Sequence, residues 1–123
     1  MRIVLDTSSI LFGFSNSVNV FSKAQEHFPG CTIVLSNGVI SELEKLSKGN
    51  SKVSGYARIA LLEIDAYKQK IEIEKSRMYV DKWIEAKSRH ADYIICTNDT
   101  ALRKRIRKGA AKVFALSRSG AFS

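Results

Sequence analysis

Two segments of this sequence that are predicted to be strands end in an aspartate. Asp6 follows residues 2–5, and Asp99 follows residues 94–98. A carboxylate at the tip of a buried strand, with hydroxyl and amide residues beside it, is well placed to hold a hard cation through oxygen ligands. Each aspartate also has a simpler interpretation, because Asp6 suits an Asx turn and Asp99 suits the cap of a following helix. Two such aspartates at the same edge of one sheet favour a shared site.

Two predicted helices supply further acidic side chains. With Val39 at zero on a helical wheel, Glu42 and Glu44 lie at the two margins of the apolar face of the helix at 38–47. Helical periodicity therefore makes both glutamates candidates for the site and does not distinguish between them. Asp81 lies at the margin of the apolar face of a later helix, near its start. The alternatives are a solvated helix face for the glutamates and a favourable interaction with the helix dipole for Asp81.

A cluster of carboxylates without histidine, cysteine or lysine requires cations, because four like charges cannot otherwise share a small space. Mg²⁺ and Mn²⁺ prefer carboxylate oxygens and keep waters in their shells. One such ion lowers the pKa of a bound water, and a second stabilises the leaving oxygen of a phosphodiester. The chain carries 20 Lys and Arg against 12 Asp and Glu, a net charge of +8, which favours a polyanionic partner. A basic protein with a small acidic site is typical of a nuclease.

The elements that must position these acids alternate between strand and helix. Strands are predicted at 2–5, 32–35, 71–74, 93–97 and 112–116, and helices at 18–28, 38–47, 53–67, 76–89 and 100–108, with a loop at 49–52. The strands are nearly continuous apolar runs, which favours a parallel sheet covered on both faces. Ligands of such sheets bind outside the carboxyl ends of the strands, where Asp6 and Asp99 stand.

Length and composition indicate a single domain over residues 1–123. Apolar residues make up 45% of the chain, and no apolar stretch reaches the roughly 18–20 residues that span a bilayer. No signal peptide is expected at the N-terminus. Cys31 and Cys96 lie inside apolar runs and form neither a disulfide framework nor a zinc site, which fits a reducing, cytoplasmic location. His27 and His90 lack a ligand-spaced partner, so surface or helix-end positions are expected.

Four segments of the chain resemble the PIN-domain family, in order and over nearly the whole length. They are Ile3–Ser8, Val39–Leu43, Val80–Ile84 and Ile95–Asp99. The resemblance implies an α/β fold, a three-layer α/β/α sandwich with a central, mainly parallel sheet. It also implies an endoribonuclease that cleaves single-stranded RNA and depends on one or two Mg²⁺ or Mn²⁺ ions. The last of these segments and the residues after it are similar to the archaeal and eukaryotic branch that matures ribosomal RNA.

The resemblance also assigns roles to residues of the site. The catalytic and metal-binding positions fall to Asp6, Glu42, Asp81 and Asp99. The positions of side chains that help to order the site fall to Thr7, Thr97 and Asn98. Family members often carry a further acidic residue beside the third acidic position, whereas this chain has Lys82 there. That lysine either lowers the occupancy of the metals or contacts a phosphate of the substrate.

Basic residues crowd the helix that begins after Asp99. A solvated face is the usual role of such a run, and a surface that follows RNA phosphates is the alternative here. The candidates for RNA binding are Lys82, Arg103, Lys104, Arg105, Arg107 and Lys108. Phe12 and Phe14 are the aromatic residues best placed to stack on bases, although core packing competes for at least one of them.

Other functions fit parts of this pattern. A catalytically weak RNA-binding or assembly module would keep the fold; Lys82 argues mildly for it and the four filled acidic positions argue against it. A toxin ribonuclease would use the same chemistry under the control of an antitoxin. A phosphoryl-transfer domain with Asp6 as nucleophile is disfavoured, because Ser8 stands where a second aspartate is needed. The partners to consider are therefore RNA, a ribosome-assembly factor, an antitoxin or a second copy in a homodimer.

Overall fold

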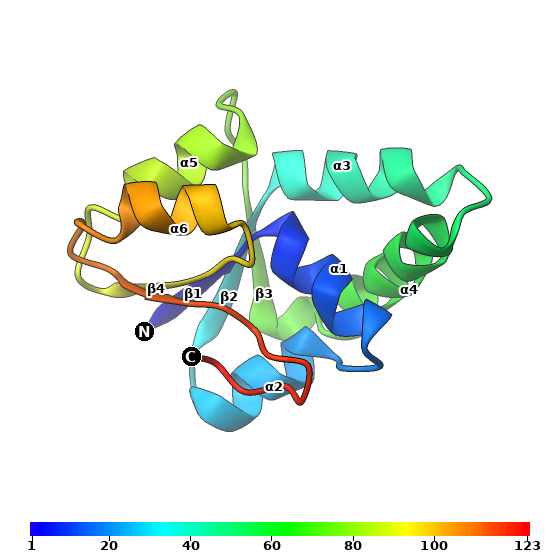
Figure 1. The fold of residues 1–123 in the computed structure, drawn as a ribbon, viewed down its shortest axis with the longest axis horizontal. Coiled ribbons are helices and arrows are strands. Elements are labelled where there is room, and N and C mark those ends of the chain that lie inside the picture. The colour runs from blue at the N-terminus through cyan, green and yellow to red at the C-terminus, as the bar shows by residue number, and fades with distance from the viewer.

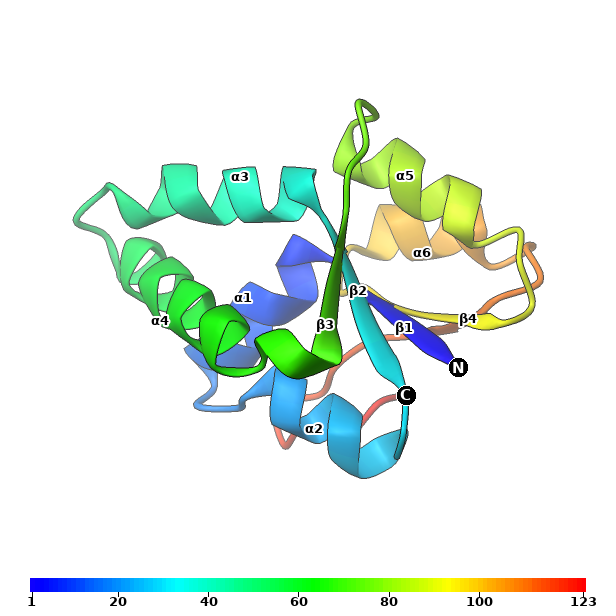
Figure 2. The same ribbon diagram turned by 180° about the vertical axis from the view of Figure 1, so that it is seen from behind.

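The computed structural model describes residues 1–123 as a parallel five-stranded sheet between two layers of helices (Figure 1, Figure 2). The strands are β1 (Arg2–Leu5), β2 (Thr32–Ser36), β3 (Ile71–Glu74), β4 (Tyr93–Cys96) and β5 (Lys112–Phe114). The helices are α1 (Thr7–Ser15), α2 (Val20–His27), α3 (Asn37–Ser47), α4 (Lys52–Ala66), the 3-10 turn η1 (Lys68–Lys70), α5 (Val80–Lys87) and α6 (Thr100–Ile106). The predicted three-layer α/β/α fold is confirmed.

The order of the strands creates a switch point at the centre of the sheet. The order is β3-β2-β1-β4-β5, so the chain builds outward on one side of β1 and then crosses to the other side. Helices α1, α3 and α4 lie on one side of the sheet, and α5 and α6 lie together on the other (Figure 1, Figure 2). Ligands of parallel sheets bind where the order reverses, at the carboxyl ends of the strands. The register pairs Leu5 with Cys96, so Asp6 and Thr97 follow side by side at this point.

The core forms on the central strands, which helices cover on both faces. Ile3, Val4 and Leu5 of β1 have no exposed surface, and β4 is buried throughout. Burying one such side chain contributes roughly 1.5–3 kcal/mol, which is why continuous apolar runs become central strands. Cys31 and Cys96 are buried and free, as expected, and burial raises the pKa of the Cys96 thiol to about 12. This thiol is therefore a packing group rather than a nucleophile.

Helix α1 was not among the elements predicted from the sequence. Its residues lack a simple alternation of polar and apolar faces because α1 packs against α2, α3 and α4 in addition to the sheet. Gly13 permits the tight exit of this helix, since a Cβ atom there would stand 2.8 Å from the carbonyl oxygen of Val18. A helix enclosed on several sides does not carry the periodic stripe by which helices are recognised.

Two predicted boundaries were also wrong. Ser76 does not cap α5; its hydroxyl accepts a bond from the backbone N–H of Met78 (3.0 Å), and the helix begins at Val80. Residues 75–79 instead form a loop beyond the end of β3. Strand β5 ends at Phe114, and Leu116 forms an isolated antiparallel bridge with Phe122. None of the helices combines the length and the apolar composition that crossing a membrane requires.

Candidate active site

Asp6 is the one buried acidic residue of the chain, with 6% of its surface exposed. It precedes α1 as the N-cap residue, yet its side chain accepts no capping bond. The hydroxyls of Ser8 and Thr97 both donate to its Oδ2 atom, each at 2.7 Å, so Oδ1 has no side-chain partner. Burial raises the pKa of Asp6, the two hydroxyl bonds offset part of that rise, and the charge of Asp81 adds to it. The Asp6 carboxylate is thus held in place without a cation.

Ser8 is a site-ordering residue that the sequence did not reveal. Besides its bond to Asp6, its hydroxyl accepts the backbone N–H of Asn98 at 3.0 Å and lies 3.2 Å from the Thr97 hydroxyl. It thereby links the start of α1 to the end of β4. Thr7, which the resemblance nominated, has a buried hydroxyl with no hydrogen-bond partner. A serine two residues after a strand-ending aspartate is the only signal the sequence offers for Ser8.

Asn98 orders the same edge by joining it to the C-terminal segment. Its Oδ1 atom accepts bonds from the Ser9 hydroxyl (2.8 Å) and from the backbone N–H of Leu116 (3.0 Å). Its Nδ2 atom donates to the carbonyl of Leu116 at 2.9 Å. Both ends of the amide are therefore occupied by the protein, and Asn98 acts as scaffold rather than as a ligand.

Asp99 caps a helix with one carboxylate oxygen and leaves the other without a hydrogen bond. Its Oδ1 atom accepts the backbone N–H of Leu102 at 3.1 Å, which is the N-cap bond of α6. Its Oδ2 atom makes no hydrogen bond. The backbone N–H of Asp99 donates to the Thr97 hydroxyl at 3.1 Å. The capping interpretation and the site interpretation are compatible, because each uses a different carboxylate oxygen.

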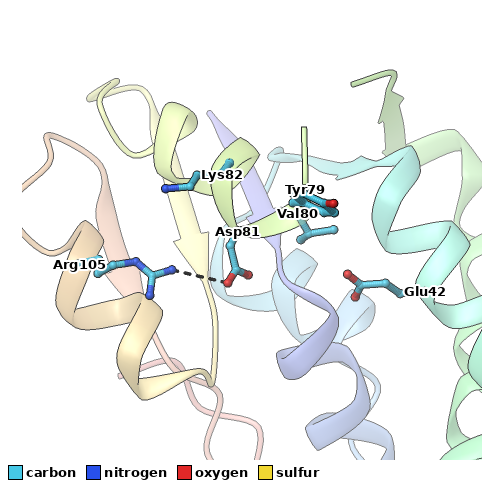
Figure 3. A pocket seen from close by; sticks show the side chains of 6 residues that line it. All are labelled: Glu42, Tyr79, Val80, Asp81, Lys82 and Arg105. Atoms are coloured by element: carbon cyan, nitrogen blue, oxygen red, sulfur yellow. Dashed lines mark ion pairs between the residues drawn. The ribbon is translucent and has the colours of Figure 1, made fainter. Parts of the chain in front are cut away.

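Glu42 and Asp81 line an open pocket of about 450 Å³ (Figure 3). Glu42 projects from α3 and Asp81 from the start of α5, and Glu42 is exposed and has no ion-pair partner. The guanidinium of Arg105 lies 3.5 Å from Asp81 Oδ2 and 2.8 Å from Glu85. Lys82 extends away from the carboxylates of Glu42 and Asp81 in this view, and it forms an ion pair with Glu85 at 3.3 Å.

The four acids surround one end of the sheet but do not converge on a single point. The charge of Asp81 acts on Asp6, and the pKa of Arg105 is raised first by its bond to Glu85 and further by Asp81 and Asp99. No three His, Cys, Asp or Glu side chains stand close enough to hold one metal ion together. Oxygen-only donors suit Mg²⁺ or Mn²⁺, and Mg²⁺ commonly binds through one or two carboxylates while keeping several waters. The residues present fit an ion held in that way.

The basic and aromatic residues predicted to bind RNA differ in how exposed they are. Lys104 on α6, and Arg107 and Lys108 directly after it, are exposed and form no ion pair. Arg103 is half-buried and donates to the carbonyl of Thr97 at 3.3 Å. Phe12 and Phe14 are half-buried and pack against the core. The exposed aromatic side chain at the pocket is Tyr79, with 88% of its surface accessible.

Comparisons with known proteins agree with this architecture. A family model for the PIN-like domain matches residues 3–119. The fold is similar to that of the PIN domain endonuclease Utp24, with a TM-score of 0.75 and 25% identity over 94% of this chain and 85% of that chain. No curated protein matches this sequence.

Two further solved structures are similar in fold alone. A domain of a functionally unknown protein from Methanocaldococcus jannaschii DSM 2661 has a TM-score of 0.68 and 15% identity, over 94% of this chain and 91% of that chain. The PIN domain of human SMG5 has a TM-score of 0.64 and 11% identity, over 94% and 93%. Since the family match spans nearly the whole sequence, and the overall fold is similar to that of these structures, the chain belongs to the PIN-like domain family.

Proposed function

We propose that this protein is a metal-dependent endoribonuclease that cleaves single-stranded RNA, acting in the cytoplasm. The observation that carries the proposal is Asp6, a buried carboxylate that no lysine or arginine neutralises. A buried charge without a partner is costly, so it persists where a cation from outside supplies the missing charge. The similarity to an endonuclease, Utp24, supports the same function.

Each carboxylate has a distinct part in this proposal. Asp6 and Asp99 follow the adjacent strands β1 and β4, and each offers one oxygen that no side chain of the protein bonds, Oδ1 and Oδ2 respectively. Asp81 and Glu42 stand across the pocket, where they would hold metal-bound waters in place. A bound Mg²⁺ or Mn²⁺ supplies a more acidic water and neutralises charge on the phosphodiester. Ser8 and Thr97 fix the orientation of Asp6 while this occurs.

RNA is the proposed substrate because the chain is basic outside this acidic edge. The net charge is +8. Exposed and unpaired cations lie on α6, the helix that Asp99 caps, and just beyond its end: Lys104, Arg107 and Lys108. Lysine and arginine gain affinity for phosphates by releasing condensed counterions. Processing of ribosomal RNA is the finer role that we propose, because the residues from 95 onward resemble the branch of the family that matures it.

The test is cleavage of end-labelled single-stranded RNA in Mn²⁺ or Mg²⁺, with EDTA and single-stranded DNA in parallel. Asp6→Asn and Asp99→Asn should each abolish cleavage, because each removes a proposed ligand. Asp92→Asn is the matched control, since Asp92 is exposed and precedes β4 at the opposite edge of the sheet. Glu42→Gln and Glu44→Gln form a second pair on one helix, and only the former should lose activity. Cleavage that survives EDTA, or that Asp6→Asn retains, would exclude the proposed site.

A catalytically weak RNA-binding module is the second candidate, and the spacing of the acids favours it. No three metal-binding side chains stand close together, and Arg105 already pairs with Asp81. On this alternative the protein binds single-stranded RNA with equal affinity in EDTA and in Mn²⁺ and leaves it uncut.

A further inference from the structure

The loop between β3 and α5 carries the most exposed aromatic side chain of the chain. Tyr79 is 88% exposed, and its neighbour Met78 is 52% exposed. The loop projects beyond the carboxyl end of the sheet, between α3 and α5 (Figure 1, Figure 2). A tyrosine ring with so little of its surface buried contributes little to the fold, and its surface is free to contact a partner.

The backbone beneath Tyr79 is fixed on both sides. The Ser76 N–H donates to the Asn37 side chain at 2.8 Å, which ties the loop to the start of α3. The carbonyl of Tyr79 accepts the N–H of Trp83 at 3.0 Å, in the first turn of α5. Val80 and Trp83, which follow Tyr79, are buried in the core. The ring is therefore presented from an anchored base, so binding a partner requires little further ordering of the backbone.

The chemistry around the ring identifies the partner. Tyr79 lines the pocket that also holds Glu42, Asp81 and Arg105 (Figure 3). In the same loop, the exposed side chains of Lys75 and Arg77 form no ion pair and line a second hollow of about 390 Å³. A flat ring that lines the pocket of the candidate acids and shares its loop with two unpaired cations has the composition of a single-stranded nucleic-acid platform, in which bases stack and basic groups follow phosphates.

We infer that Tyr79 is a stacking platform for one unpaired nucleobase of the RNA, with Lys75 and Arg77 binding the phosphates on the far side of that nucleotide. The inference rests on the proposed function for the nature of the polymer. The inference also gives the RNA a path: the RNA chain crosses the β3–α5 loop and passes over Tyr79 into the pocket that is lined by Asp81. Stacking does not depend on base identity, so the platform positions RNA without reading a defined sequence.

Binding and cleavage must be measured separately to test this. In EDTA, where cleavage does not occur, fluorescence anisotropy gives the Kd of a short unstructured RNA for each variant. Stacking on one base is worth about 1–3 kcal/mol, so Tyr79→Ala should weaken binding about tenfold and Tyr79→Phe should bind like the wild type. Leu62→Ala is the control, because Leu62 is 72% exposed on α4, away from the pocket. Both side chains are exposed, so neither replacement disturbs the core.

An abasic site moved along the RNA supplies the decisive comparison. At one position it should weaken binding to the wild type about tenfold and should have no effect on Tyr79→Ala, because the ring and the base act together. Lys75→Ala and Arg77→Ala should each lower the slope of log Kd against log salt by about 0.7, the value for one phosphate of a single strand.

The platform and the nuclease can fail independently. RNA that is bound with the expected abasic dependence but never cut in Mn²⁺ would support the platform and refute the nuclease. RNA that is cut by a Tyr79→Ala variant of unchanged Kd would refute the platform alone. The platform is also refuted if Tyr79→Phe is as weak as Tyr79→Ala, since the hydroxyl would then be the contact. A change confined to self-association in sedimentation would refute it too, and would assign the loop to a contact between copies.

Discussion

Replacing Asp6 with asparagine should abolish metal binding while making the metal-free protein more stable. Bonds to a charged acceptor are worth roughly 1.5–3 kcal/mol and neutral ones about 0.5–1.5, so the amide loses about 2 kcal/mol over the bonds from Ser8 and Thr97. Burying an ion costs several kcal/mol, a cost that the amide avoids. Because the pKa of Asp6 is raised, burial outweighs those bonds, and we expect a net gain of about 1 kcal/mol at neutral pH.

Because the pKa of Asp6 is raised on folding, the stability difference between Asp6→Asn and the wild type should depend on pH. In the folded protein the pKa of Asp6 is raised above the ordinary aspartate value of 3.8. At pH values between 3.8 and the folded pKa, the native state therefore binds more protons than the unfolded state. Wild-type stability then falls as pH rises through that window, and the penalty stays constant above it. The difference between Asp6→Asn and the wild type should therefore be small below about pH 3.8 and reach its full size near neutrality.

Urea unfolding in EDTA, at a series of pH values, measures this difference. Heating at pH 7 should give a melting temperature about 3–5 °C higher for the variant. Adding Mg²⁺ should stabilise the wild type, by about 2.7 kcal/mol at a concentration one hundred times Kd, and leave Asp6→Asn unchanged. Ser8→Ala is the companion variant: it keeps the charge but removes a donor, so it should destabilise by about 1–2 kcal/mol. A variant Asp6→Asn that is less stable than wild type by 1 kcal/mol or more would refute the reasoning.

Three further predictions concern residues around the same edge and one distant pair. Thr7→Val removes a buried hydroxyl that has no partner, so thermal unfolding in EDTA should show unchanged or slightly higher stability; a loss above about 1 kcal/mol would show that the hydroxyl has a role in the apo protein. Arg105→Gln removes the cation 3.5 Å from Asp81, so Mn²⁺ titration followed by thermal shift should give a tighter midpoint, with little change in stability because both side chains are about half exposed. A weaker midpoint would instead make Arg105 part of the site. Burial alone would raise the pKa of Glu74, but the ammonium of Lys87 at 2.8 Å outweighs it and holds that pKa below 4.5. The stability from this pair is therefore present above pH 4.5 and lost as pH falls through the folded pKa, and Lys87→Met should cost about 1–2 kcal/mol at pH 7 and remove that acid dependence in urea titrations.

Most of the fold follows from local patterns in the sequence. Four strands of the sheet coincide with apolar runs, and β3 coincides with the alternating segment at 71–74. Five of the six α-helices overlap predicted helices because one side of each faces solvent. Helix α1 was not predicted because other helices enclose it, so its sequence has no solvent-facing polar side. The start of α5 was misplaced because Ser76 has the chemistry of a cap but uses its hydroxyl within the loop. Both failures arise where tertiary contacts decide what a local signal means.

The candidate site was predictable only in part, for a related reason. Asp6 and Asp99 could be chosen because the ends of parallel strands meet at one edge, whatever the details of packing. The role of Ser8 depends on the register of β1 against β4, which brings its hydroxyl to Asn98 across 90 residues of sequence. The exposure of Tyr79 depends on the shape of a loop that the sequence assigned to a helix. Side chains whose partners lie on other elements cannot be identified from spacing alone.

The way Asp6 is held supports the proposal that it binds a cation rather than serving only the fold. A carboxylate that served only the fold would gain most from a lysine or arginine, and the chain has 20 of them. Asp6 instead receives two neutral hydroxyls on one oxygen, which orient it without cancelling its charge. Asp81 adds a second negative charge to its surroundings, and the nearby Arg105 pairs with Asp81 rather than with Asp6. On the proposed function, the protein accepts a loss of stability to keep one oriented charge available, and an added cation offsets that loss.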